Sequence, residues 1–197
     1  MNQQPNPASF LKDVIARFGG DSVSVERKRP PVHLWNPEFC GNIDMRIARD
    51  GRWYYMGTPI DRIPMVKLFA GILRREPDDA YVLVTPVEKV GIRVDDVPFL
   101  AVEMQFEGEG RQRRIAFRTN LDEIVPLDAE HPLRVDVAPE TGEPSPYINV
   151  RDRLEARLAR PVYYQMAELA EPADDDPSLL GVWSAGGFHA LGKVDVD

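Results

Sequence analysis

The chain has 197 residues, a length that allows one large domain or two small ones, and a core of that size needs no metal or disulfide to be stable. With 43% hydrophobic and 28% charged residues, the composition is typical of a folded protein and excludes a largely disordered one. The formal net charge of -8 opposes the phosphate backbone of DNA and RNA, so we expect no sequence-independent binding to nucleic acid.

The first half of the sequence predicts two helices and four strands. Residues Ser9 to Phe18 carry one apolar stripe that a glycine pair ends, and we expect this N-terminal helix to dock on the body of the protein. Prolines then stiffen a connector that runs to Pro37. Strands are expected at 42–48, 53–56, 80–86 and 87–94, with a helix between the second and third that Pro64 opens and Pro77 stops.

The second half predicts a similar order of elements. Strands are expected at 99–106 and 113–119, and a short one at 133–137 within the irregular, proline-rich stretch from 120 to 146. Asn149 is expected to cap a helix through Arg160, with Val150, Leu154 and Leu158 as its apolar stripe. Pro161 is expected to stop this helix before a strand at 162–169.

Hairpin, helix and strand therefore follow one another twice. A βαβ crossover would give the same alternation, but the Asp-Gly and Gly-x-Gly turns favour antiparallel hairpins. We predict an α+β fold of two tandem, structurally similar units, each an antiparallel sheet with one packed helix. The N-terminal helix and connector occupy residues 1–29, the first unit 30–98 and the second 99–197. An aromatic tail with Trp183 and Phe188 should pack back onto the second unit.

The cellular location follows from simple features of the sequence. Cys40 is the only cysteine, so no internal disulfide can form, as is typical of proteins in a reducing compartment. The first residues lack the apolar core of a signal peptide, and no apolar stretch approaches the roughly 20 residues that span a bilayer. We expect a cytoplasmic protein that is not integral to a membrane.

No motif for catalysis is present in the sequence. There is no Cys-x-x-Cys or His-x-x-x-His pair, so no metal site is expected, and no cofactor motif occurs. Ser184 lies in a string one residue short of a Gly-x-Ser-x-Gly elbow and lacks its strand and helix. Two short basic runs, 26–29 and 111–114, are interpreted as solvated surface rather than as phosphate sites.

Several polar and aromatic side chains on stiff connectors predict a ligand cleft. The candidate ligand-binding residues are His33, Trp35, Asn36, Lys89, Arg118, Thr119, Asn120 and Trp183. We expect Trp35 to offer a stacking face and Arg118 a forked set of donors, in one cleft that His33 and Asn120 also line. The alternative is that both tryptophans are core residues and that Arg118 pairs with Asp122 at the surface.

Five strings of the sequence together resemble a bacterial family known as domain of unknown function 1285. They are PPVHLWNPEFCGNIDMRIARDG, LVTPVEK, FRTN, PYINVRDRLEARL and GVWSAGGFHAL, and the similarity extends from Pro30 to Leu191. The resemblance implies two similar α+β halves, the second loosely similar to pleckstrin-homology domains. It also implies a nucleotide-like ligand at the interface of the halves and a role in signalling, and it brings no catalytic residues.

The sequence favours a binding module over an enzyme. The first hypothesis is a non-catalytic module that binds a small molecule, with a nucleotide as one candidate, at the interface of the two units. The alternatives are a hydrolase that acts on a similar ligand and a scaffold that binds another protein. An enzyme would need an activated nucleophile or a carboxylate-bound metal beside the cleft, whereas a scaffold would need a broad exposed apolar patch.

Overall fold

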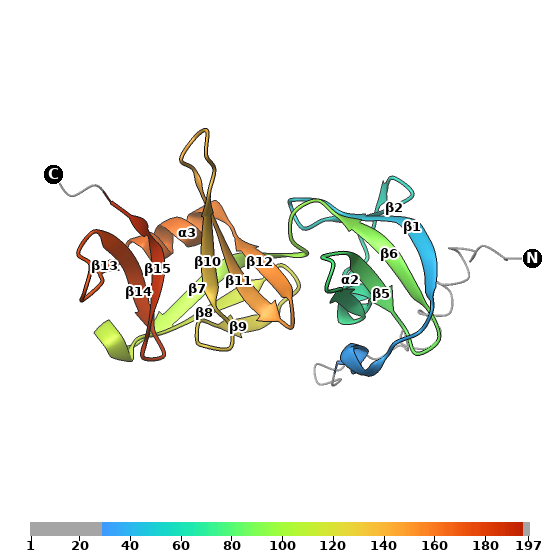
Figure 1. Ribbon diagram of the computed structural model, residues 1–197, viewed down its shortest axis with the longest axis horizontal. Helices are drawn as coiled ribbons and strands as arrows, with labels where there is room; N and C mark the ends of the chain where they lie inside the picture. The colour runs from blue at the N-terminus through green and yellow to red at the C-terminus, as the bar shows by residue number, and fades with distance from the viewer. Residues whose placement is uncertain (1–28, 195–197) are drawn as a thin grey trace, which may run out of the picture. The chain divides into compact units, whose positions relative to one another are not determined.

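The computed structural model describes residues 29–194. The chain divides into two units between Asp96 and Val97, and Figure 1 colours the elements of the first from blue to green and those of the second from yellow-green to red. The N-terminal helix expected at 9–18 lies outside the described residues.

Unit 1 is a six-stranded sheet with one α-helix. Its elements are η1 (Val32–Leu34), β1 (Phe39–Ile47), β2 (Trp53–Tyr55), β3 (Thr58–Pro59), α2 (Ile63–Gly71), β4 (Leu73–Arg75), β5 (Tyr81–Val84) and β6 (Lys89–Val94). The strand order is β3-β2-β1-β6-β5-β4. All neighbours are antiparallel except the central pair, β1 and β6, which is parallel.

The core of unit 1 follows from the alternation of side chains along β1. Ile43, Met45 and Ile47 are buried on one face, as the period of two in the sequence predicts. The helix α2 begins with a proline in its first turn and buries Val66, Phe69 and Ala70. The Trp53 and Phe69 rings stack with centroids 6.3 Å apart, so the helix packs on the sheet through these aromatic residues.

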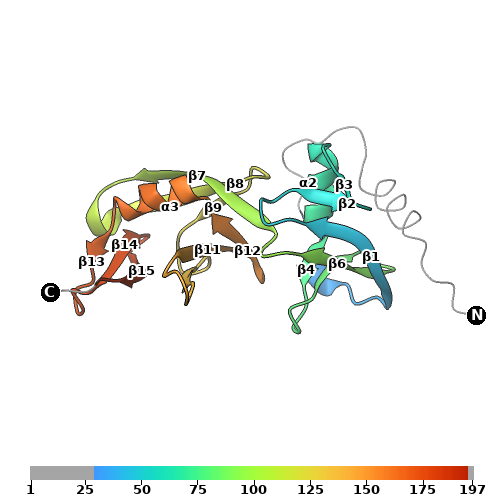
Figure 2. The same ribbon diagram turned by 90° about the horizontal axis from the view of Figure 1, so that it is seen from above.

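Unit 2 contains a second six-stranded sheet, a helix and a small third sheet. The first sheet is built from β7 (Phe99–Glu107), β8 (Arg114–Thr119), β9 (Ile124–Pro126), β10 (Leu133–Val137), β11 (Pro144–Arg151) and β12 (Leu154–Leu158), and η2 (Gly110–Gln112) joins β7 to β8. The helix α3 (Arg160–Ala167) contacts β7 (Figure 2). The last strands, β13 (Glu171–Pro172), β14 (Leu179–Ser184) and β15 (Gly187–Lys193), form the three-stranded sheet.

The two six-stranded sheets have the same topology, which confirms the two tandem, similar α+β units. The order β9-β8-β7-β12-β11-β10 in unit 2 repeats β3-β2-β1-β6-β5-β4 in unit 1. In each sheet two three-stranded antiparallel meanders meet at one parallel pair, β1 with β6 and β7 with β12. The sheets are therefore mixed rather than wholly antiparallel. The helix lies between the meanders in the sequence of unit 1 and after both of them in unit 2.

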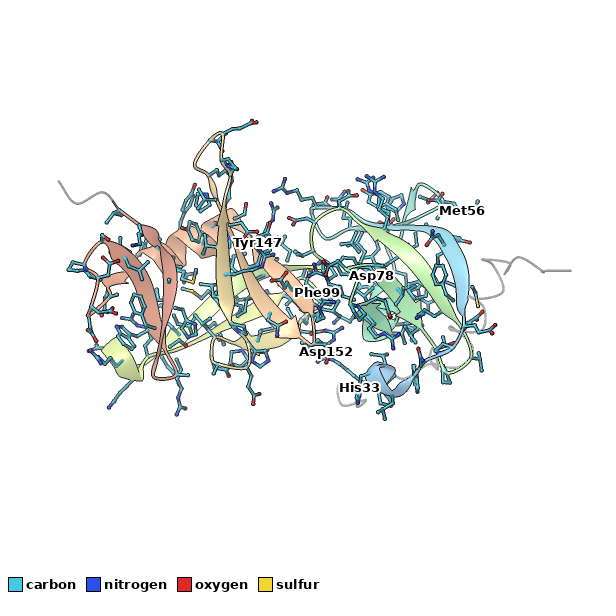
Figure 3. The ribbon with its side chains drawn as sticks, in the orientation of Figure 1. His33, Met56, Asp78, Phe99, Tyr147 and Asp152 are labelled. Carbon is cyan, nitrogen blue, oxygen red and sulfur yellow. The ribbon has the colours of Figure 1, made fainter. Side chains whose placement is uncertain are left out.

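The prediction of a helix from Asn149 to Arg160 is wrong. Residues 144–151 and 154–158 form β11 and β12, which a two-residue turn joins at Asp152 (φ 46°; Figure 3). The apolar spacing of four between Val150, Leu154 and Leu158 fits a helix, but four is also a multiple of the strand period of two. The buried side chains of β12 follow the strand period.

The elements next to the predicted helices also differ from their predicted positions. Pro161 starts α3 instead of stopping a helix, since proline is favoured in a first turn, and the strand expected at 162–169 is wrong. The helix α2 ends at Gly71 rather than near Pro77, and Leu73 leaves it to pair with Leu83 in the sheet. Glycine is a poor helix former, and Leu73 is fully buried as a strand residue.

Candidate functional site

The unit 1 residues expected to bind a ligand lie on a segment that is fastened to the sheet through its backbone. Arg74 Nη1 donates to the carbonyl oxygens of Val32 and Trp35, at 2.8 and 2.7 Å. Arg74 Nε donates to Glu76 Oε1 at 2.7 Å, and Lys89 Nζ lies 3.5 Å from Glu76 Oε2. Lys89 is therefore an internal ion-pair partner, and Trp35 is half-buried over this network.

The other two residues of this segment face away from the sheet. His33, on η1, is exposed (Figure 3), and Asn36 is exposed as well. Their side chains are accessible, and neither they nor Lys89 line the two depressions described below. The segment covers the open side of β4, an edge strand, through its contact with η1.

The three candidate residues at the end of β8 are engaged within unit 2. Arg118 Nη2 lies 2.7 Å from Glu103 Oε2, and Arg118 Nη1 donates to Asp122 Oδ1 at 3.0 Å. These hydrogen bonds, the one to Glu103 first, raise the pKa of Arg118. Thr119 Oγ1 accepts from the backbone N–H groups of the following turn, and Asn120 Oδ1 accepts from the N–H of Leu100 at 3.1 Å.

The pairing of Arg118 with Asp122 is the surface contact that the sequence offered as the alternative. Glu103 adds a second carboxylate, so the guanidinium is already coordinated on two sides. Trp35 and Arg118 belong to different units, and their shared cleft stays a prediction.

Trp183 lies in a different environment, on the outer face of the β14–β15 hairpin. Val182 and Ser184 are buried, so Trp183 and Gly181 point to the opposite face. Phe188 is the cross-strand partner of Trp183, and their rings meet edge to face with centroids 5.3 Å apart. A Cβ on Gly181 would lie 2.6 Å from the Phe188 ring, so the glycine makes room for this aromatic pair.

An arginine from the β7–β8 connection occupies the exposed face of this pair. The guanidinium carbon of Arg111 lies 4.5 Å from the Trp183 ring centroid, a cation–π contact. Arg111 also forms an ion pair with Asp174 of the loop between β13 and β14, and both side chains are 63% exposed. One face of Trp183, a candidate ligand-binding residue, is therefore occupied by Arg111.

The tip of the β14–β15 hairpin is anchored to the sheet of unit 2. Ser184 pairs with Gly187 across a two-residue turn in which Ala185 and Gly186 have φ of 50° and 79°. The Ala185 N–H donates to the Arg113 carbonyl at 2.9 Å. The Ser184 hydroxyl accepts from the Ile115 N–H at 3.0 Å and donates to the Leu127 carbonyl at 2.7 Å.

An open depression of about 620 Å³ lies at the tips of the β7–β8 and β14–β15 hairpins. Its lining includes Arg111 and Arg114, together with the residues Glu107, Gly108, Gln112, Ala185 and Gly186. We call Arg111, Arg114, Trp183 and Phe188 the basic–aromatic tip. Arg114 is 76% exposed, and its Nη1 lies 3.8 Å from Glu107 Oε1, a loose pair.

Chemically, the basic–aromatic tip can bind an oxyanion. Two exposed guanidinium groups border one depression, and guanidinium matches phosphate and carboxylate with two parallel hydrogen bonds. Stacking on Trp183 fixes the plane of Arg111, so less side-chain entropy is lost on binding. The sequence singled out Trp183 but assigned the run 111–114 to solvated surface. The contact that joins them depends on the packing of η2 against β14, which no local pattern encodes.

A second open depression, of about 500 Å³, lies in unit 1. Asn42, Tyr81 and Arg93 are among its lining residues. Arg93 is its only lining arginine, and its Nε pairs with Asp95 Oδ1 at 3.0 Å. This depression therefore offers an anion fewer positively charged groups than the basic–aromatic tip does.

Two further classes of site were considered for residues 29–194. Over that range no group of three or more His, Cys, Asp or Glu side chains is placed to hold a metal ion. None of the helices described there has the length and apolar character needed to cross a bilayer.

Fold and site together define a class of protein with two α+β units of common topology, the second of which carries an exposed arginine–tryptophan site. Residues 30–97 match the family described as "Domain of unknown function (DUF1285), N-terminal domain", and residues 98–191 match "Protein of unknown function (DUF1285), C-terminal domain". The chain belongs to the DUF1285 family. No curated protein matches it.

Two solved structures are similar to this chain. A DUF1285 family protein from Silicibacter pomeroyi DSS-3 is 46% identical, with a TM-score of 0.82 over 92% of this chain and 95% of its own. A DUF1285 family protein from Shewanella baltica OS155 is 30% identical, with a TM-score of 0.49 over 63% of this chain and 90% of its own. The first of these similarities extends over both units.

Proposed function

We propose that the protein is a non-catalytic binding module for a small anionic molecule, a nucleotide being one candidate, and that it acts in signalling. The basic–aromatic tip would hold the anionic group of the ligand. The observation that carries the proposal is the stacking of Arg111 on Trp183 beside Arg114, at the rim of the 620 Å³ depression. A module that binds without transforming its ligand is suited to report the concentration of that ligand.

Arg111 is prepared for an anion by its contacts in the free protein. The Trp183 ring supports one face of the guanidinium, an interaction of about 0.5–1 kcal/mol at an exposed site. Its partner Asp174 is 63% exposed, and a pair so open to solvent contributes only about 0–1 kcal/mol. A ligand phosphate can therefore replace the Asp174 carboxylate at little cost.

The basic–aromatic tip also has the size and rigidity that a small ligand requires. The volume of the depression that Arg111 and Arg114 line, about 620 Å³, lies within the roughly 300–1,000 Å³ typical of ligand sites. Its walls are two hairpin tips that hydrogen bonds of Ala185 and Ser184 join to each other and to the sheet. A bound anion would therefore meet two arginines that extend from an anchored backbone around one depression.

The absence of catalysis in this proposal is supported by the condition of Ser184. This serine is the nucleophile candidate nearest the basic–aromatic tip, yet it is only 1% exposed and its hydroxyl donates to a backbone carbonyl. A hydrolase acting at this site would need an activated nucleophile there. The same binding experiment can test the hydrolase alternative if it includes a measurement of product.

The proposal is tested by thermal shift and amide NMR with inorganic phosphate, pyrophosphate and a panel of nucleotides. A ligand at about 100 times its dissociation constant should stabilise the protein by roughly 2.7 kcal/mol. The Arg111→Ala/Arg114→Ala variant should lose this shift, whereas Arg52→Ala, which removes an equally exposed arginine of unit 1, should keep it. Binding should move the amide signals of Ala185 and Gly186.

An equal shift in the double variant would refute the placement of the ligand at the basic–aromatic tip. No shift with any anion in the panel would refute the proposed function. Release of free phosphate from a bound nucleotide, at a rate that the double variant lowers, would favour the hydrolase.

A further inference from the structure

The acidic loop between β13 and β14 reaches the proposed anion site. Asp174 lies on this loop, and its carboxylate pairs with Arg111. We infer that Asp174 is an internal competitor for this site: it occupies Arg111 in the free protein, so that an anion must displace it to bind, and a phosphate, which can also reach Arg114, does so more readily than a single carboxylate. This inference rests on the function proposed above.

The loop is held at both ends, which keeps Asp174 beside the site. The Ala173 N–H donates to the Leu179 carbonyl at 2.8 Å, and the Ala173 side chain is buried. On the other side, Asp176 Oδ1 accepts from the Ser178 N–H at 3.1 Å, and Asp176 Oδ2 pairs with Lys193 at 3.0 Å. Hydrogen bonding to Ser178, followed by Lys193, lowers the pKa of Asp176, so this anchor is ionised at neutral pH.

An anchored carboxylate competes with a free one through its effective concentration. A group tethered next to its partner behaves as though it were present at about millimolar concentration. A free monoanionic carboxylate forms with Arg111 the same type of pair as Asp174, so it gains nothing by the exchange and must reach a similar concentration to compete. Asp174 thus lowers the affinity of the site for monocarboxylates.

A phosphate group gains more by the exchange than a carboxylate does. It carries about -1.5 to -2 charge at pH 7 and offers three acceptor oxygens. It can pair with Arg111 and also reach Arg114, whose own partner Glu107 is 3.8 Å away and itself exposed. Two guanidinium groups then share one ligand, whereas Asp174 satisfies only Arg111.

The experiment compares Asp174→Asn with its neighbour Asp175→Asn in the full-length protein, by amide NMR titration with pyrophosphate and with acetate. Asp175→Asn removes the same charge from the same loop, so it controls for net charge. We expect Asp174→Asn to bind pyrophosphate up to about fivefold more tightly, because the exposed pair that it removes contributes no more than that. Its affinity for acetate should rise by the same factor, because both anions displace the same carboxylate, and Asp175→Asn should match the unmodified protein.

The outcomes separate this inference from the function on which it rests. If the unmodified protein binds pyrophosphate, and Asp174→Asn has the same affinity, the role of Asp174 is refuted and the proposed function stands. If Asp174→Asn binds both anions more tightly and Asp175→Asn does not, the inference is supported. If no variant shows pyrophosphate-dependent shifts at Ala185 and Gly186, the proposed function and the inference both fail.

Discussion

Replacing Ser184 with alanine removes the side chain that joins the β14–β15 hairpin to the sheet of unit 2. The hydroxyl is buried and satisfies the N–H of Ile115 and the carbonyl of Leu127. Each buried group that loses its partner costs about 1–3 kcal/mol. Because alanine also leaves a small void, we expect Ser184→Ala to lower the free energy of unfolding of unit 2 by about 2–4 kcal/mol.

Hydrogen exchange of the Ile115 amide measures this loss directly, because that amide donates to Ser184. A loss of 2–4 kcal/mol corresponds to exchange faster by about 30-fold or more, provided that the amide exchanges by unfolding of unit 2. Ser145→Ala, which removes a half-buried hydroxyl from β11, is the control and should change stability by no more than about 0.5 kcal/mol. Acceleration below about fivefold in Ser184→Ala would refute the assignment of the hydroxyl as the anchor of the hairpin.

Four further variants test individual features by thermal or urea unfolding. Gly181→Ala should destabilise the protein by about 1–3 kcal/mol, because its Cβ would lie 2.4 Å from the His189 backbone oxygen. Gly91→Ala should cost less, since the atom that its Cβ would meet is the end of the exposed Asn42 side chain. Equal losses in the two variants would contradict this. Ala185→Gly should stabilise by about 0.5–1 kcal/mol, because it relieves a left-handed alanine at φ 50°; a loss would mean that the turn is unstrained. Burial lowers the pKa of His189, so the folded state resists its protonation and the free energy of unfolding should fall as pH drops below about 6.5. His189→Gln should remove this dependence of stability on pH. An unchanged dependence would assign it to other groups.

The strands that face a core on one side could be predicted from the sequence. Residues 133–137 form the expected strand, and the strand at 99–106 is found within one residue of its predicted end, because their apolar residues alternate. The region from Asn149 to Leu158 could not be assigned in this way. Its apolar spacing suits two periods equally, and the pairing of β12 with β11 and with β7, which is distant in the sequence, decides between them.

The candidate site could also be predicted only in part from the sequence. Trp183 could be selected from the sequence because an aromatic residue next to glycines and serine in a tail needs a partner. That partner, Arg111, comes from a different hairpin, and the contact depends on how η2 packs against β14. Arg118, Thr119 and Asn120 were selected for their polar atoms, which the structure uses to close the β8–β9 turn and to bind neighbouring groups.

The parallel pair at the centre of each sheet has a consequence for the order of folding. Each antiparallel meander joins strands that are neighbours in the sequence, so closing its loops costs little entropy. The parallel pairs, β1 with β6 and β7 with β12, join the first and last strands of each six-stranded sheet, and their formation should limit the folding rate. Before that step, each six-stranded sheet has two strands with one unpaired edge, and the equivalent strands of the other sheet have the same unpaired edges. The divergence of the two halves in sequence then protects the newly made chain, because it disfavours pairing of β1 with β12 or of β7 with β6.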